Sequence, residues 1–166
     1  MTEAKSVSIP EAVRTLAQVV QIRGIRLLKA SCETEDPKPG DRIGELQVGL
    51  RIGYLRENES RLLRCFVGLD VGATSRAEPT RMIARFSCDY DVGYEVPLER
   101  LSALSDSDCE LFAGFNGVYN AWPYARELFQ TTSAKMAIPI VTLPIYRVGM
   151  FAPPAPAPES TAPDVK

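Results

Sequence analysis

Three stretches of alternating apolar and polar residues follow one another between residues 46 and 96, and this pattern constrains the fold most. A period of two places successive side chains on opposite faces of a strand, so each stretch predicts a strand with one buried face. Turn residues at 57–60 and 72–79 separate the stretches and predict tight connections. The apolar files are Leu46, Val48, Leu50, Ile52 and Tyr54, then Leu63, Cys65, Val67, Leu69 and Val71, then Met82, Ala84, Phe86, Cys88, Tyr90, Val92, Tyr94 and Val96.

A further strand is predicted over residues 19–33, where branched apolar residues are interrupted by basic ones. The proline-rich and charged residues 34–41 predict a loop after it. Residues 8–11 have the form of a capping box, which predicts a short helix before the first strand. The helical spacing that supports this prediction is that of Ala12, Val13, Leu16, Ala17 and Val20.

Helical spacing returns after Leu101, where Ser105 and Asp108 form a second capping box. Because Pro123 would damage a helix interior, we predict that two helices meet at Asn120, which is the N-cap of the second and places Pro123 in its first turn. Pro139 is predicted to end the second helix. Its predicted buried stripe is Ala125, Leu128, Thr132 and Met136, with Arg126, Glu127, Gln130 and Lys135 in solvent.

Strands that come first and helices that come last predict an α+β fold, a four-stranded antiparallel sheet with C-terminal helices packed on one face. The 166 residues fit one domain over residues 1–150, in which residues 1–18 are an N-terminal extension with the short helix. Residues 151–166 are rich in alanine and proline, and are expected to form a disordered, solvated tail.

Composition disfavours several classes of partner and site. Nineteen basic and 21 acidic residues give a net charge of -2, which argues against nucleic-acid binding. No apolar run is long enough for a membrane helix and no signal segment is visible, so we expect a cytoplasmic protein without a membrane partner. The four cysteines are far apart and the chain has no histidine, so we expect buried free thiols, with a disulfide or metal site as the less favoured alternative.

Catalytic motifs are weak in this sequence. The lack of histidine excludes triads that need an imidazole base, and neither a glycine-rich dinucleotide loop nor a P-loop occurs. Asp89 and Asp91 project to the same strand face and could act as general acid and base. They also alternate with apolar residues as the wet side of a strand does, and we favour that interpretation. We therefore expect no enzyme activity and no cofactor.

Residues 120–127, NAWPYARE, resemble the helix-opening signature of the bacterial export chaperone SecB, in which proline, tyrosine, alanine, arginine and glutamate follow one another. Residues 139–144, PIVTLP, are similar to the proline-bounded apolar segment after that helix, with the closing proline one residue nearer. The order of the predicted strands also fits the family. The resemblance covers residues 21–148 and is most specific in the last third.

The resemblance implies an ATP-independent chaperone that keeps non-native polypeptides soluble for export, and a tetramer built from two dimers. It places the client groove between the loop after the first strand, the sheet and the second helix, where apolar grooves and sheet edges bind extended chains. The candidate groove residues, each of which could instead be a core or interface residue, are Tyr54, Phe66, Phe86, Tyr90, Trp122, Tyr124 and Phe129. The helix junction that would support the oligomer comprises Asn120, Trp122, Pro123, Tyr124, Arg126 and Glu127.

Two departures from the family bear on the export role. Residues 152–166 contain neither cysteine nor histidine, which argues against docking to the motor SecA through a metal-binding tail. The family's exposed sheet face is acidic, whereas here it is expected to mix Arg51, Arg56, Arg64 and Arg85 with carboxylates, so complementarity to the same motor is reduced. A dedicated chaperone or adaptor for one client, such as an antitoxin, is therefore a second hypothesis, and a small-molecule enzyme is a third.

Overall fold

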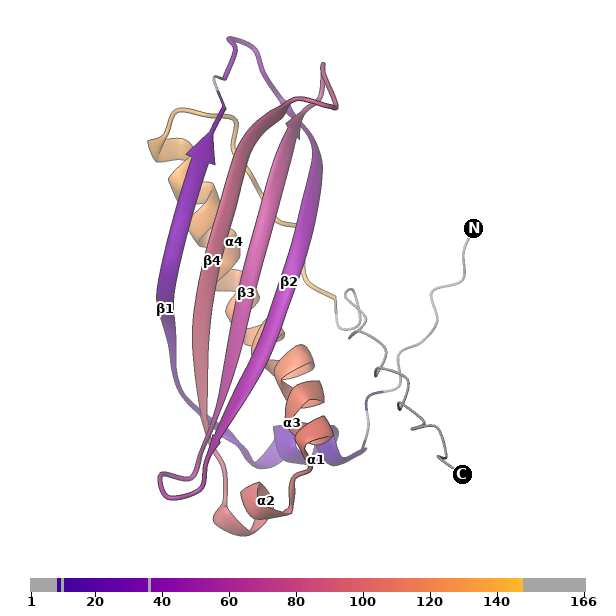
Figure 1. Ribbon diagram of the computed structural model, residues 1–166, viewed down its shortest axis with the longest axis vertical. Helices are drawn as coiled ribbons and strands as arrows, with labels where there is room; N and C mark the ends of the chain where they lie inside the picture. The colour runs from indigo at the N-terminus through magenta and orange to yellow at the C-terminus, as the bar shows by residue number, and fades with distance from the viewer. Residues whose placement is uncertain (1–8, 10, 36, 148–166) are drawn as a thin grey trace, which may run out of the picture.

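The four predicted strands form one antiparallel sheet in the computed structural model, which describes residues 9, 11–35 and 37–147 (Figure 1). The order across the sheet is β1-β4-β3-β2. This confirms the predicted α+β fold with a four-stranded antiparallel sheet. The strands are β1 (Gln21–Thr34), β2 (Ile43–Glu57), β3 (Leu62–Ser75) and β4 (Met82–Glu95).

The hairpins β2–β3 and β3–β4 bring the apolar files onto one face, because Leu50 pairs with Leu69 and Leu69 pairs with Cys88. Strand β1 returns to the other side of β4, where Ile25 pairs with Val92. The turn between β3 and β4 is shorter than predicted, since β3 continues to Ser75 and the connection is residues 76–81. Ladder hydrogen bonds therefore extend past Gly72, where the sequence indicated a turn.

The helices lie at one end and along one face of the sheet (Figure 1). Helix α3 begins with the predicted capping box, in which Ser105 and Asp108 bond each other's backbone amides. The predictions missed α2, a short helix that carries one buried residue, Leu101. The helical elements are α1 (Glu11–Val19), α2 (Leu98–Ala103), α3 (Asp106–Phe112), a π-helical turn (Ala113–Gly117) and α4 (Val118–Lys135).

The predicted break at Asn120 is wrong, because α4 continues through Pro123. The helix tolerates this proline because the loss of one main-chain bond is offset by a continuous buried stripe along the sheet. The stripe also differs from the prediction by about one position: Phe129 is buried, whereas Met136 is exposed. Its buried members are Val118, Ala121, Trp122, Ala125, Phe129 and Ser133.

A π-helical turn, which holds one residue more than an α-helical turn, joins α3 to α4. Gly117 lies in this turn, and a Cβ atom built on it would lie 2.9 Å from the Cβ of Cys65. The glycine therefore lets the helix approach β3 closely. Tyr94 supports the same turn from β4, packing edge-on against Phe112 with a centroid distance of 5.0 Å.

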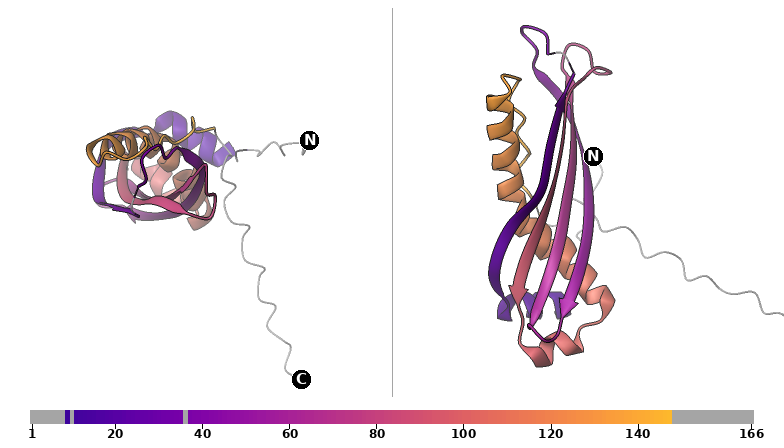
Figure 2. Two further views of the ribbon diagram at one scale, coloured as in Figure 1. Left: turned by 90° about the horizontal axis from the view of Figure 1, so that it is seen from above. Right: turned by 60° about the vertical axis from the view of Figure 1, so that its left-hand side comes forward.

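Helix α4 covers one face of the sheet and leaves the opposite face open (Figure 2). Residues 138–147 run back beside α4, with Ile138, Val141 and Leu143 buried. Helix α1 adds Val13 and Leu16 to the core, as its spacing predicts. Ser8 and Pro10 of the first capping box lie outside the described residues, as does the predicted tail at 151–166.

Candidate functional site: a groove between β1 and α4

A hollow of about 670 Å³ lies between the start of β1, the first half of α4 and the C-terminal segment. Four strand residues around a register shift in β1, a helix surface and a segment far along the chain meet here. We call it the β1–α4 groove. Its lining residues are Ile22, Arg23, Gly24, Ile25, Tyr119, Asn120, Trp122, Pro123, Tyr124, Arg126, Ile145 and Tyr146.

One wall of the groove is an aromatic cluster centred on Tyr146. Its ring lies 5.3 Å from that of Trp122 and 6.3 Å from that of Tyr119, measured between centroids. The indole Nε1 of Trp122 donates a hydrogen bond of 2.8 Å to the carbonyl oxygen of Pro144. Trp122 therefore fixes the C-terminal segment against α4 and gives this wall a defined shape.

Asn120 is positioned by a buried hydrogen-bond network beneath the groove. Its amide Nδ2 donates to the Tyr94 hydroxyl at 2.8 Å and to the Asn116 carbonyl at 2.9 Å. The Tyr94 hydroxyl in turn donates to the Asn116 carbonyl at 2.9 Å. Burial raises the pKa of Tyr94, so the hydroxyl stays protonated and keeps its donor. The network joins α4 to β4 beside the π-helical turn.

Apolar side chains are unusually exposed around this groove and along β1. Large apolar residues that water reaches are normally scattered singly, whereas a gathered set indicates a binding surface. Strand β1 is also an edge of the sheet, since only β4 pairs with it among the described residues. The exposed fractions are 50% for Ile22, 43% for Leu27, 48% for Leu28, 57% for Tyr119, 48% for Tyr124 and 72% for Ile145.

Two arginines line the groove. Arg23 is largely exposed and pairs with Glu95 at 2.5 Å. Arg126 was expected to lie in solvent, but it is half-buried because α4 turns this side of the helix toward β1. Its Nε is buried and has no hydrogen-bond acceptor in the part of the chain that the structure describes.

The structure gathers the predicted junction residues but disperses the predicted groove residues. Asn120, Trp122, Pro123, Tyr124 and Arg126 line the β1–α4 groove, whereas Glu127 is exposed on α4 outside it. The remaining predicted groove residues lie elsewhere: Phe86, Tyr90 and Phe129 are buried beneath α4, Tyr54 is half-buried beside α3, and Phe66 is on the open face.

The positions of these aromatic rings follow from their contacts. Phe86 and Phe129 pack together with a centroid distance of 5.1 Å. Burial, together with the neighbouring carboxylate of Asp106, raises the pKa of Tyr54. Phe66 lies 5.3 Å from the guanidinium carbon of Arg64, which stacks over its ring. These rings stabilise the fold on both sides of the sheet.

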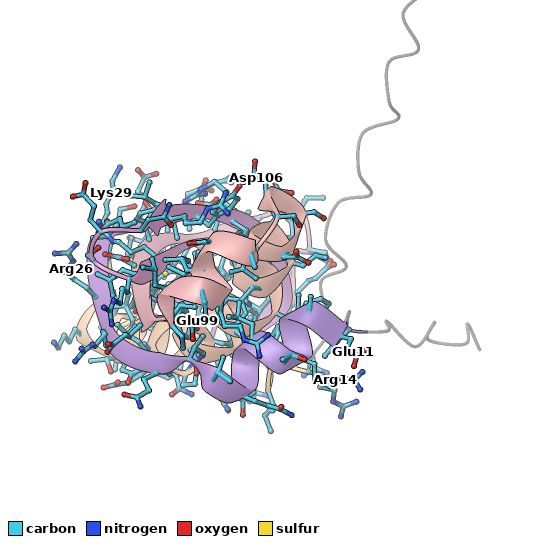
Figure 3. The ribbon with its side chains drawn as sticks, turned by 90° about the horizontal axis from the view of Figure 1, so that it is seen from below. Glu11, Arg14, Arg26, Lys29, Glu99 and Asp106 are labelled. Atoms are coloured by element: carbon cyan, nitrogen blue, oxygen red, sulfur yellow. The ribbon has the colours of Figure 1, made fainter. Side chains whose placement is uncertain are left out.

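The open face of the sheet is covered by ion pairs between neighbouring strands. Arg51 pairs with Asp70 and, at 2.8 Å, with Asp89. Gly68 makes room for this bridge, because a Cβ atom there would lie 2.7 Å from Asp89 Oδ1 and 2.8 Å from Arg51 Nη2. Arg26 and Lys29 point outward from the β1 side of the molecule (Figure 3).

Arg56 does not belong to this face, contrary to the prediction. The alternation of β2 places it on the helix-covered side, where it binds Asp106 at 2.8 Å and the carbonyl of Leu104. It therefore ties β2 to the start of α3 and contributes nothing to the charge of the open face.

Asp91 is the most buried carboxylate of the open face, with 8% of its side chain exposed. Burial alone would raise its pKa, but hydrogen bonds from Arg64, and then from Arg26, outweigh burial and lower the pKa. Asp89 and Asp91 share a strand face, as predicted, and each is bound by arginine. The pattern is that of a structural charge ladder between strands.

The cysteines, the acidic side chains and the helices of the described residues offer few other candidates for a functional site. All four cysteines are free; Cys65, Cys88 and Cys109 are buried, as predicted, whereas Cys32, which was also expected to be buried, is half-buried. The described ranges contain no cluster of three or more cysteine, aspartate or glutamate side chains that could hold a metal ion. Within the same ranges, no helix has the length and apolar character needed to cross a membrane.

Seven of the twelve lining residues were not predicted from the sequence. Ile22, Arg23 and Ile25 were placed on a strand, but nothing in the sequence indicated that this strand borders α4. Tyr119 precedes Trp122 by one helical turn, a spacing that could have marked both as one surface. Ile145 and Tyr146 follow the apolar segment at 139–144 and have no signal of their own.

Comparison with known structures identifies the fold. The SecB-like chaperone Rv1957 of Mycobacterium tuberculosis, in complex with a ChAD peptide from the Rv1956 HigA1 antitoxin, matches with a TM-score of 0.71. The two chains are 19% identical over 83% of this chain and 98% of that chain. A protein of unknown function from Streptococcus agalactiae is 12% identical, with a TM-score of 0.39, over 75% of this chain and 96% of its own.

No protein-family model matches the chain, and no curated protein matches it. The likeness to Rv1957 nevertheless covers most of both chains, including the sheet and the helix that follows it. The protein therefore has a SecB-like fold.

Proposed function

We propose that this protein is an ATP-independent chaperone that binds non-native polypeptides in the β1–α4 groove and along the β1 edge. The observation that carries the proposal is the gathering of exposed apolar side chains at the groove, where Ile145 is 72% exposed and Tyr119 is 57% exposed. An unfolded chain offers apolar side chains and unpaired backbone, and an apolar groove beside a strand edge binds both. The proposed activity involves neither catalysis nor a cofactor.

The likeness to a SecB-like chaperone in complex with an antitoxin peptide supports a polypeptide client. It also favours a dedicated client, such as an antitoxin, as the second candidate beside general holding for export. The open face supports the narrower role, since Asp70, Asp89 and Asp91 are already bound by arginines of the same sheet. Contact with the motor SecA would have to compete with these pairs, so we do not include it.

We further propose that the protein acts in the cytoplasm as a homo-oligomer, a tetramer built from two dimers. Support comes from the unpaired edge of β1 and from Leu27 and Leu28 on it, which are 43% and 48% exposed. A second copy could pair with the part of this edge around Leu27 and Leu28 and cover these side chains, which leaves β1 residues 22–25 at the groove for the client. Light scattering coupled to size-exclusion chromatography tests the assembly, and a monomer at all concentrations would contradict it.

Suppression of aggregation tests the chaperone activity. Several unfolded proteins are diluted from denaturant with and without the purified chain, and light scattering is followed in the absence of nucleotide. We expect stoichiometric suppression for a general chaperone, and suppression of one client alone for a dedicated one. An absolute requirement for ATP, or no suppression of any client, would refute the proposal.

Matched variants connect the activity to the groove. Ile145→Ser and Tyr124→Ser remove exposed apolar groups from the lining, and we expect weaker suppression with little change in folding. Met136→Ser is the control, because Met136 is 39% exposed at the C-cap of α4 but lies outside the lining. Equal activity of all three variants would place the binding surface elsewhere.

A further inference from the structure

We propose that the β1–α4 groove selects client segments that carry an acidic side chain among apolar ones, and that Arg126 receives the carboxylate. The inference rests on the proposed function, because it specifies which polypeptides the groove holds. It starts from a nitrogen of a charged side chain at the groove wall that the described residues leave without an acceptor.

Arg126 has no acceptor for its buried Nε among residues 9, 11–35 and 37–147. A buried N–H without an acceptor costs free energy, and arginine remains charged at every physiological pH. Arg126 lines the groove, so its guanidinium lies where an incoming group can approach it. Its planar fork matches a carboxylate, to which it donates two parallel hydrogen bonds.

The charge of the lining points to the same ligand. The twelve lining residues include two arginines, Arg23 and Arg126, and no aspartate or glutamate. The carboxylate that reaches Arg23 comes from Glu95, outside the lining. A positive group in a hollow with apolar walls is less screened than one on an open surface, so it attracts anionic groups more strongly.

Arginines on the open face provide an internal comparison. Arg51 binds two carboxylates, and Arg64 binds Asp91 and Glu57. The sheet thus supplies carboxylates to the arginines that stabilise it. Arg126 differs because it borders a hollow with exposed apolar walls, which is the arrangement expected of a group kept for a ligand.

The remaining lining defines the rest of the client segment. Ile22, Tyr124 and Ile145 offer apolar contacts, and the backbone of β1 offers hydrogen bonds to an extended chain. An extended apolar segment with one carboxylate satisfies all three features. The charge complementarity at Arg126 therefore favours a client segment with a carboxylate over a purely apolar one.

Peptide binding to the full chain tests the inference. Fluorescein-labelled peptides in which leucine and phenylalanine alternate with serine carry a central aspartate, asparagine or lysine, and their affinities are measured by fluorescence anisotropy. A hydrogen-bonded charge pair predicts that the aspartate peptide binds about tenfold more tightly than the asparagine peptide at low salt. High salt should reduce this ratio.

Variants assign the preference to one residue. Arg126→Gln should bind the aspartate and asparagine peptides equally, and Arg126→Lys should retain part of the preference as a point charge. Arg100→Gln is the control, because Arg100 is exposed on α2 and lies outside the lining, and it should preserve the full ratio. Thermal unfolding of each variant establishes that it folds.

The outcomes separate this inference from the proposed function. Equal binding of the aspartate and asparagine peptides by the unaltered protein, with aggregation suppression intact, overturns the inference alone. Absence of both peptide binding and suppression overturns both. If Arg126→Gln lowers the oligomeric mass and keeps the aspartate preference, then Arg126 serves a contact between copies, for example with Glu127 of another copy, and the inference is overturned.

Discussion

Replacing Asp91 with asparagine removes a negative charge from a site where 8% of the side chain is exposed. The carboxylate accepts hydrogen bonds from Arg64, one of them 3.2 Å long from Nε, and a bond of 2.9 Å from Arg26. Asparagine keeps the shape but presents an amide donor to a guanidinium donor. Arg64 would keep its ion pair with Glu57, which is 3.3 Å long, and its stacking on the ring of Phe66. The loss is therefore partial.

The expected cost follows from the partners. Arg26 is 66% exposed and returns to water, so its pair contributes little. Arg64 is 26% exposed and loses charge-assisted bonds to a buried acceptor, for which we expect a loss of about 2–3 kcal/mol in the free energy of unfolding. With a urea m-value of about 2 kcal/mol/M, the unfolding midpoint should fall by about 1–1.5 M.

Urea titration followed by circular dichroism, at two protein concentrations to separate unfolding from dissociation, measures this cost. Asp70→Asn is the matched control, because Asp70 pairs with Arg51 on the same face but its side chain is 49% exposed. It should cost about 0–1 kcal/mol. Equal losses for the two variants would refute the argument that burial makes the Asp91 pair strong.

The pH dependence of stability gives a second test of Asp91. Its pKa is lower in the folded protein than in the unfolded chain, so the unfolded chain binds the proton more readily in acid. The stabilisation is present above the unfolded pKa of about 3.9 and is lost as the pH falls through the lower folded pKa. Asp91→Asn should lose less stability than the unaltered protein over this acid range.

Two further perturbations test the buried groups beside the groove. Tyr94→Phe removes the hydroxyl that joins Asn116 and Asn120, and should lower the free energy of unfolding by about 1–2 kcal/mol. Backbone amides near the π-helical turn should then exchange their hydrogens faster. Unchanged exchange would contradict this role of the hydroxyl. Burial raises the pKa of all four thiols, to about 12 for Cys88, but Cys32 is half-buried whereas the other three are buried. At pH 8 a thiol reagent should therefore modify Cys32 first. Rapid modification of several thiols in the folded protein would count against this expectation.

The hairpin strands could be predicted because their alternation is long and regular, and each turn leaves little choice of partner. The strand that pairs with β1 could not be predicted in this way. Its alternation is interrupted by register shifts between Ile22 and Gly24 and between Leu27 and Lys29, and its pairing with β4 spans most of the sheet's sequence. Because the groove exists only where β1 meets α4, its strand half was out of reach of the sequence.

Helix prediction failed for a different physical reason. Pro123 signals a break locally, but burial of Trp122 and Phe129 on the sheet favours a continuous helix. After Ala125 the buried side continues through Phe129 and Ser133, and a helix allows this spacing as readily as the predicted one through Leu128 and Thr132. Arg126 could be named from the SecB-like motif, but its place at the groove could not be predicted because the strand that borders it could not.

Salt should separate the two kinds of arginine in this fold. On the open face, the partly exposed pairs of Arg51 are within the chain, so added salt weakens the folded state slightly and has no direct effect on a client in the groove. Arg126 Nε has no such acceptor among the described residues, so the charge of this side chain matters most when a client carboxylate arrives. A salt concentration that leaves the urea midpoint almost unchanged should then weaken the binding of acidic clients alone. If salt instead weakened all clients equally, the charge that attracts them would lie on the open face.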